Sequence, residues 1–393
     1  MRASRTIGRP KRSSRFRSSV FFAAAVAAVG IIFLIQSLAA TNPNLKGDLD
    51  NDNKVGLADL SILLTNYQKN GNVADLNADN KTTLADLSIL LTNYGKVYTP
   101  PVTPPVTPPT TGEGRSIKGQ SLYVYKPGAW ASRPRAIYDY QVGSWGGPGE
   151  VDGVVDQATA AGKLALFVTY NIPGRDCGSY SAGGAGSSGA YRGWIDNFVN
   201  GVGNRKAIII LEPDALSQMD CLSGGDQATR LADLAYAVDA FKNRTQASVY
   251  IDAGNADWIP VPTITDRLKR ANIAKATGFA LNVSNFKLSS DSVNYGERIV
   301  TALGQQGIAN PRYVIDTSRN GRGALPQGGE SWCNPPGRGL GKRPTTSPDA
   351  GEHNDAYLWI KPPGESDGTC NGGPGAGQWY PAYAQMLIDN AVY

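Results

Sequence analysis

Histidine is almost absent from this chain of 393 residues, in which His353 is the only one. A Ser-His-Asp or Cys-His catalytic centre would need that single residue in the right place. A zinc site built from imidazole ligands is nearly excluded for the same reason. If the chain is an enzyme, carboxylates are therefore the expected proton carriers.

The excess of positive charge is small, at +5, and it is concentrated at the N-terminus. The clustered basic residues are Arg2, Arg5, Arg9, Lys11, Arg12, Arg15 and Arg17. Without them the chain is close to neutral, so its charge gives no case for a nucleic-acid partner.

An apolar run at residues 20–40 follows the basic cluster and ends near the small residues Ser37, Ala39 and Ala40. Residues 1–40 are therefore expected to be an export signal. An uncleaved N-terminal membrane anchor is the alternative, because the run is long enough to span a bilayer. Both interpretations place the rest of the chain outside the cytoplasm, so we expect an extracellular protein.

Cysteine is scarce, with four residues: Cys177, Cys221, Cys333 and Cys370. An even number in an exported chain favours two disulfides, and three pairings are open. The simplest joins the cysteines that are near in sequence, Cys177 with Cys221 and Cys333 with Cys370.

One unit occurs twice, at residues 48–67 and 75–94, and its segment LADLSILLTNY is identical in both copies. Each copy places oxygen ligands at loop positions 1, 3, 5 and 12 and a backbone carbonyl at position 7, which is a set suited to Ca²⁺. The first set is Asp48, Asp50, Asp52, Lys54 and Asp59. The second set is Asp75, Asn77, Asp79, Lys81 and Asp86.

The doubled loop-and-helix pattern resembles the dockerin module of cellulase complexes. The resemblance implies a small all-α calcium-binding module at residues 44–97. The module could bind a cohesin-type partner or serve as a calcium-stiffened spacer. The alternative to both is an acidic surface repeat that binds no metal. Residues 98–114 are a Pro/Thr run, which predicts an extended linker.

From about residue 118 short apolar runs alternate with helical patterns, which favours an α/β fold with a parallel sheet. The expected strands are 121–125, 164–170, 207–211, 248–251, 278–283, 313–315 and 357–360. The expected helices include 151–161, 190–202, 227–242, 293–306 and 382–390. Seven strands in this length suggest a closed or nearly closed barrel, with an open doubly wound sheet as the rival.

Five of the expected strands run into acidic residues: Asp176, Glu212 with Asp214, Asp252, Asp316, and Glu365 with Asp367. A single Asp in such a place is more often a helix cap or turn residue. Five together at the carboxyl ends of strands indicate a catalytic rim. Neighbouring carboxylates cannot all ionise easily, so one stays protonated, as glycoside hydrolysis requires.

Several motifs resemble glycoside hydrolase family 6, the inverting cellulases. They are YNIPGRDC at 170–177, LEPD at 211–214, YIDAG at 250–254, SWCN at 331–334 and WIKPPGESDG at 359–368. The resemblance implies a distorted seven-stranded parallel (β/α) barrel at residues 115–393, a β-1,4-glucan substrate and no cofactor for catalysis.

Residue roles follow from these motifs. Asp214 would be the general acid, Asp176 would raise its pKa and position water, and Asp367 would be the base or a charge stabiliser. A water chain toward Asp176 is the alternative base. Tyr170 would lie under the reacting sugar and Asp252 would be structural. The implied substrate-binding residues are Lys361, Glu365, Asn282, Trp332 and Trp258. Each Trp alone is as readily a core residue. The resemblance implies the same two disulfides as the sequence-near pairing.

The compact catalytic region, which in this family goes with an open cleft, favours an endo-β-1,4-glucanase. A cellobiohydrolase of the same family and a non-catalytic glucan-binding or scaffold protein remain alternatives. A retaining glycosidase is a weaker one.

Overall fold

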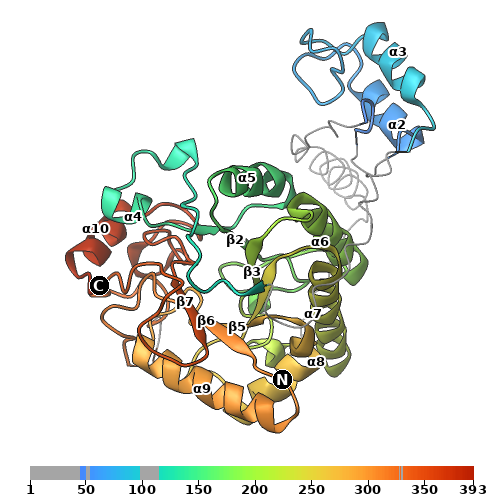
Figure 1. Ribbon diagram of the computed structural model, residues 1–393. Helices are drawn as coiled ribbons and strands as arrows, with labels where there is room; N and C mark the ends of the chain where they lie inside the picture. The colour runs from blue at the N-terminus through green and yellow to red at the C-terminus, as the bar shows by residue number, and fades with distance from the viewer. Residues whose placement is uncertain (1–44, 50–53, 98–114, 327, 329–330) are drawn as a thin grey trace, which may run out of the picture. The chain divides into compact units, whose positions relative to one another are not determined.

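The computed structural model describes residues 45–49, 54–97, 115–326, 328 and 331–393 (Figure 1). The chain divides into two compact units, Met1–Val106 and Thr107–Tyr393. The expected export signal or anchor, the Pro/Thr linker, and the loop residues Asp50 and Asp52 lie outside the described residues. No helix within those described ranges is long and apolar enough to cross a membrane.

The described part of the first unit contains two helices that share the sequence LADLSILLT, α2 (Leu57–Thr65) and α3 (Leu84–Asn93). The equivalent residues Leu63 and Leu90 are fully buried in its small apolar core. Asp59 accepts the backbone N–H of Gly56 at 2.7 Å, and Asp86 accepts that of Thr83 at the same distance. Each Asp therefore caps its own helix, as an acid near a helix N-terminus should.

The second unit is built on seven parallel strands in the order of the sequence, β1 to β7. They are β1 (Gly143–Ser144), β2 (Ala165–Thr169), β3 (Ala207–Leu211), β4 (Ser248–Asp252), β5 (Gly278–Leu281), β6 (Arg312–Asp316) and β7 (Asn354–Leu358). Six of the expected strands are confirmed, although β7 begins three residues before the expected range 357–360 and ends at Leu358. The expected strand at 121–125 is wrong, because Leu122 makes only an isolated bridge to Leu164. The first strand is instead β1, which is too short to leave an apolar run in the sequence.

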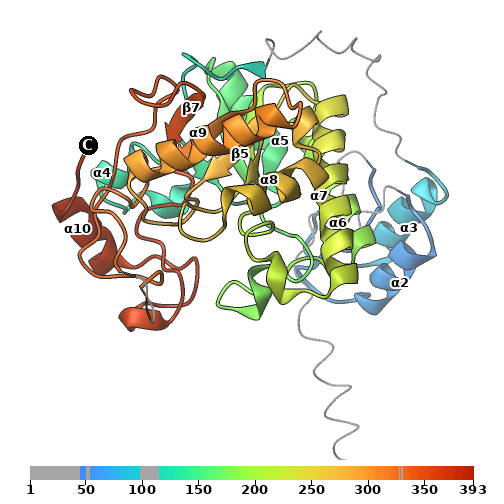
Figure 2. The same cartoon turned by 90° about the horizontal axis from the view of Figure 1, so that it is seen from below.

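Helices cover the outside of the sheet in both views (Figure 1, Figure 2). They are α5 (Pro148–Ala160), α6 (Ser188–Val202), α7 (Gly224–Arg244), α8 (Val261–Arg270) and α9 (Ser289–Gln305). Two further helices, α4 (Arg135–Tyr138) and α10 (Pro381–Asp389), pack with Leu340 and Trp359 in a separate apolar cluster. The five helices predicted from the sequence are confirmed, and α4 and α8 were missed. The alternation of parallel strands and outer helices is the predicted α/β architecture.

The strand side chains are sorted between two apolar clusters, because successive residues point to opposite faces of a sheet. Phe167, Ile209 and Ile251 pack with residues of the outer helices. Leu166, Ile208 and their equivalents on the other strands fill the concave interior. The sheet therefore has no polar face, as expected for strands buried on both sides.

The two edges of the sheet approach one another without forming a strand ladder among the described residues. The N–H of Gly143 in β1 donates to Trp359 O, just beyond β7, at 3.2 Å. A Cβ at Gly143 would lie 2.2 Å from Ile360 O, so only glycine permits this approach. The strand count suggested a closed or nearly closed barrel, and the fold is a curled half-barrel whose two edges meet without a ladder in the part of the chain that the structure describes.

Candidate active site

A cavity of about 770 Å³ opens at the carboxyl ends of the strands. Seven of the site residues expected from the sequence line it: Tyr170, Asp176, Asp214, Trp258, Trp332, Lys361 and Asp367. They come from the loops that follow β2, β3, β4, β6 and β7, so the parallel sheet brings distant segments to one place.

Asp214 follows β3 in a left-handed backbone conformation, with φ of 68°. Its N–H donates to Asp252 Oδ2 at 2.9 Å, which fixes the turn that carries it. Burial is the largest cause that raises the pKa of Asp214 well above its usual value, and the charges of Asp252 and Asp176 add to it. A carboxyl whose pKa is raised in a cavity holds its proton to higher pH and can therefore serve as a general acid.

Asp252 lies behind Asp214 and does not line the cavity. Its side chain is 1% exposed, and Oδ2 also accepts the N–H of Gly254 at 3.2 Å. Burial raises the pKa of Asp252 to about 7. Its position supports the Asp214 turn and places a second titrating carboxyl next to it.

Glu212 was predicted as one of the strand-end acids, but it was assigned no role of its own from the sequence. It is completely buried, and its Oε2 accepts the N–H groups of Asn171 and Ile172, each at 2.9 Å. Burial raises the pKa of Glu212 to about 7. This carboxyl at the end of β3 thus holds the loop after β2, which carries Tyr170 and Asp176.

Asp176 begins the short 3₁₀ turn η3 (Asp176–Gly178) and also has a left-handed backbone, with φ of 54°. Its Oδ2 accepts the N–H of Ser181 at 2.7 Å. The adjacent disulfide Cys177–Cys221 joins this loop to the one that carries Asp214. The first predicted cysteine pair is therefore confirmed, and it ties two acid-bearing loops together.

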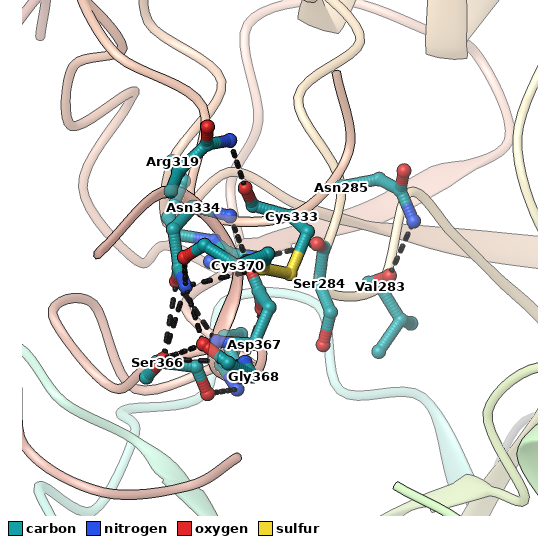
Figure 3. A network of polar contacts seen from close by, with 12 residues as sticks. Val283, Ser284, Asn285, Arg319, Cys333, Asn334, Ser366, Asp367, Gly368 and Cys370 are labelled. Carbon is teal, nitrogen blue, oxygen red and sulfur yellow. Dashed lines mark hydrogen bonds and ion pairs between the residues drawn. A yellow bond between two sulfur atoms is a disulfide. The ribbon is translucent and has the colours of Figure 1, made fainter. Parts of the chain in front are cut away.

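Asp367 is held in a dense network of polar contacts (Figure 3). Its Oδ2 accepts from Arg319 Nη1 at 2.8 Å and from the N–H of Asn334 at 3.1 Å. Lys361 Nζ lies 3.6 Å from Oδ1. Burial alone would raise the pKa of Asp367, but Arg319 and Lys361 outweigh it and hold the pKa below the usual value.

The second predicted disulfide, Cys333–Cys370, is also confirmed. It lies within the same network as Asp367 (Figure 3). Arg319 in that network is fully buried, so its ion pair with Asp367 is shielded from solvent. Arg319 was missed by the sequence reasoning because arginine in a loop has no spacing signal that marks a buried partner.

Asp316, the remaining strand-end acid, is a structural centre rather than a cavity residue. It is completely buried and accepts the N–H groups of Ser284, Ser318 and Lys361 at 3.0, 2.9 and 3.1 Å. These residues follow β5, β6 and β7 respectively. One carboxylate therefore fastens three neighbouring loops at the rim.

Aromatic side chains line the cavity on more than one side. Trp258 and Trp332 are 39% and 42% exposed, so neither is a core residue. Tyr170 meets the ring of Trp145 edge to face at 5.4 Å, and Trp145 Nε1 donates to Ile360 O at 2.8 Å. Trp145 also lines the cavity and was not predicted. Exposed aromatic faces of this kind suit the apolar face of a pyranose ring.

Two expected substrate-binding residues have side chains occupied elsewhere. Glu365 forms a largely buried ion pair with Arg133 at 2.8 Å. Asn282 is fully buried and donates to Asp316 O at 2.8 Å while accepting from the N–H of Lys287 at 2.9 Å. Neither lines the cavity. His353 pairs with Glu297 at 2.7 Å and is not a cavity residue either.

A parallel half-barrel whose rim cavity is lined by one carboxyl of raised pKa, one ion-paired carboxylate and exposed tryptophans defines a site of the glycoside hydrolase class. The chain belongs to glycosyl hydrolases family 6, because residues 130–391 match the sequence model of that family.

Curated relatives and a solved structure agree with that assignment. The chain is 47% identical over 258 residues to endoglucanase A of Cellulomonas fimi, covering 64% of this chain and 54% of that protein. It is 48% identical over 247 residues to endoglucanase A of Thermobispora bispora, covering 62% and 52%. The chain thus spans about half the length of these relatives.

The structure resembles that of the endoglucanase Cel6 from Mycobacterium tuberculosis, solved in complex with methyl-cellobiosyl-4-deoxy-4-thio-β-D-cellobioside. The TM-score is 0.66 at 40% sequence identity, over 70% of this chain and 99% of that one.

Proposed function

We propose that this protein is an extracellular, inverting endo-β-1,4-glucanase that hydrolyses cellulose or a related β-glucan. The observation that carries the proposal is that two carboxyls lining one cavity have pKa values shifted in opposite directions. The pKa of Asp214 is raised by burial and neighbouring charge, while Arg319 and Lys361 keep that of Asp367 low. Endo action is supported by the endoglucanase names of the relatives at 47% and 48% identity.

In the proposed reaction Asp214 donates its proton to the glycosidic oxygen as the bond from that oxygen to the anomeric carbon breaks. Water attacks the anomeric carbon from the opposite face, forms the new C–O bond and loses a proton. Tyr170 would lie beneath the reacting sugar, and Trp258 and Trp332 would stack on neighbouring ones. Lys361 would contact sugar hydroxyls, and the reaction needs no cofactor.

Two groups are candidates for the base that removes the proton from water, Asp367 and water held near Asp176. The ion pair with Arg319 makes Asp367 a weak proton acceptor, which supports a role as a fixed negative charge beside the developing cation. Water held near Asp176 is the alternative base. Azide should restore activity to Asp176→Ala if Asp176 acts on the nucleophile, and to Asp367→Ala if Asp367 does.

The Asp214→Asn variant tests the enzyme against the glucan-binding alternative. We expect the rate on carboxymethyl cellulose to fall by about 10³-fold or more, because the acid is lost, while binding to cellulose persists. Wild-type protein that releases no reducing ends from any β-glucan would overturn the proposal.

Viscosity measured against reducing ends separates the endoglucanase from a cellobiohydrolase. Internal cleavage should lower the viscosity of soluble cellulose early, whereas release of cellobiose from chain ends should not. The anomer of the first product, observed by NMR, separates an inverting from a retaining enzyme.

We further propose that residues 44–97 form a dockerin-like, calcium-binding module. In the second loop the N–H of Asp79 donates to both Asp75 Oδ1 and Asn77 Oδ1, at 3.2 and 3.1 Å, so these oxygens face the same turn. They are hard oxygen donors of the kind Ca²⁺ prefers. Asp86 fits less well, since both of its oxygens accept backbone N–H groups. No group of three acidic, His or Cys side chains within the described ranges is already arranged as a metal site.

Calcium titration by calorimetry, with Asp75→Ala as the comparison, tests this module. A cohesin-type partner and a spacer role are separated by whether the full chain binds an isolated cohesin. Cleavage of residues 1–40, against retention as an anchor, is read from the N-terminus of the secreted protein.

A further inference from the structure

The loop after β7 carries Asp367, but it contains little regular structure of its own. Its only described element between β7 and α10 is the single 3₁₀ turn η6 (Cys370–Gly372). The residues around Asp367 are instead held by the segment that contains Cys333 and Asn334 (Figure 3). The disulfide Cys333–Cys370 provides one connection, and the side chain of Asn334 provides several more.

Asn334 binds the chain on both sides of Asp367. Its Nδ2 donates to Ser366 Oγ at 3.0 Å, to Gly368 O at 2.8 Å and to Cys370 O at 3.1 Å. Its Oδ1 accepts the N–H of Asp367 at 2.9 Å. The side chain is 2% exposed, so water does not compete for these bonds.

The backbone of Asn334 also contacts the carboxylate itself. Its N–H shares Asp367 Oδ2 with Arg319, at 3.1 and 2.8 Å. Among the residues that the structure describes, the contact of Oδ1 is the longer approach of Lys361 Nζ, at 3.6 Å. Since Asp367 lines the cavity, the oxygen left to act there is Oδ1.

We propose that Asn334 is a positioning residue for the hydrolytic reaction: it holds Asp367 so that Oδ2 stays bound to Arg319 and Oδ1 faces the substrate. This inference rests on the proposed glucanase function. Asn334 itself does not line the cavity and needs no contact with the sugar. Nothing in its sequence context marks the role, because its partners are more than 30 residues away.

The test is Asn334→Gly, because Asn334 has a left-handed φ of 45° that glycine adopts without strain. The matched control is Asn371→Gly. Asn371 has a φ of 46° and donates to Cys333 O at 2.8 Å, so it belongs to the same pair of loops, yet no hydrogen bond between it and Asp367 is seen in the described structure.

We expect Asn334→Gly to lower kcat on soluble cellulose by about 10- to 100-fold, because displacement of a reacting group by a fraction of an ångström is costly. KM should stay within about twofold, since the stacking residues are untouched. The acid limb of kcat/KM should move to higher pH as the contact with Arg319 loosens. Asn371→Gly should match the wild type in all three measurements.

A double-mutant cycle with Asp367→Asn separates positioning from a general loss of stability. If Asn334 acts through Asp367, the second substitution adds little to the first. Multiplicative losses, an unchanged acid limb, or equal effects of the two glycine variants would overturn the proposal. Failure of the proposed function itself is distinguishable, because the wild type and Asp214→Asn would then not differ in activity.

Discussion

The Asp252 carboxyl raises the pKa of Asp214 without touching the cavity. Replacing Asp252 by Asn removes that charge but leaves an oxygen to accept the N–H of Asp214. The pKa of Asp214 should fall, and the alkaline limb of kcat/KM should move to lower pH by about one unit. The pH–rate profile measures this, with Asp239→Asn on the surface of α7 as the control. An alkaline limb that stays in place or rises would contradict the assignment of Asp214 as the acid.

Glu212 gives a stability prediction, because burial raises its pKa from 4.5 to about 7. Between these values the folded protein holds a proton that the unfolded chain has lost, so the free energy of unfolding falls as the pH rises. The full loss is about 3 kcal/mol and is complete above pH 7. Glu212→Gln keeps an acceptor for Asn171 and Ile172 but cannot titrate.

Urea unfolding of wild type and Glu212→Gln from pH 5 to pH 8 tests this. The stability of the variant relative to the wild type should improve steadily across that range. Parallel curves would show that Glu212 does not titrate there.

At the scale of elements, Glu297 connects α9 to the segment before β7. It accepts the N–H of His353 at 3.0 Å and the hydroxyl of Tyr313 at 2.9 Å. Burial would raise the pKa of Glu297, but His353 and Tyr313 outweigh it and lower the pKa. The stabilisation is therefore present above the unfolded pKa and is lost as the pH falls through the folded one.

Glu297→Gln should cost about 1 kcal/mol at pH 7 and less at pH 4. The midpoint of urea unfolding at the two pH values measures the difference. Glu352→Gln, the exposed neighbour of His353, is the matched control. A cost that is equal at both pH values would show that the charge of Glu297 is not what stabilises this contact.

Six strands could be predicted because each has a continuous apolar run, whereas β1 has only two residues and is a strand through its pairing with β2. Helix α8 was missed although Val261, Ile264 and Leu268 are spaced for one buried face, because Pro260 and Pro262 indicate a loop. The strand-end acids of the site could be predicted from position alone. The roles of Arg319, Asn334 and Trp145 could not, since each depends on a partner far away in the sequence.

At the scale of the whole molecule, the two units have separate apolar cores. If the first binds calcium, its unfolding alone should respond to chelation. Calcium at 100 times its Kd would contribute about 2.7 kcal/mol to that unit. EDTA should lower one calorimetric transition and leave the second transition and the hydrolysis rate unchanged.

Asp75→Ala should reduce the calcium dependence of the first transition even in the presence of the metal. Chelation that moves both transitions, or neither, would contradict a calcium site confined to the first unit.

The contact between β1 and the end of β7 is the weakest connection around the half-barrel. Elsewhere neighbouring strands share a ladder of backbone bonds, but here Gly143 contributes a single one, to Trp359. Opening is cheapest where the fewest such bonds must break. The indole of Trp145 and the ring of Tyr170 stand at this edge. We therefore expect the half-barrel to open first at this edge, beside Tyr170, before the strands from β2 to β7 separate.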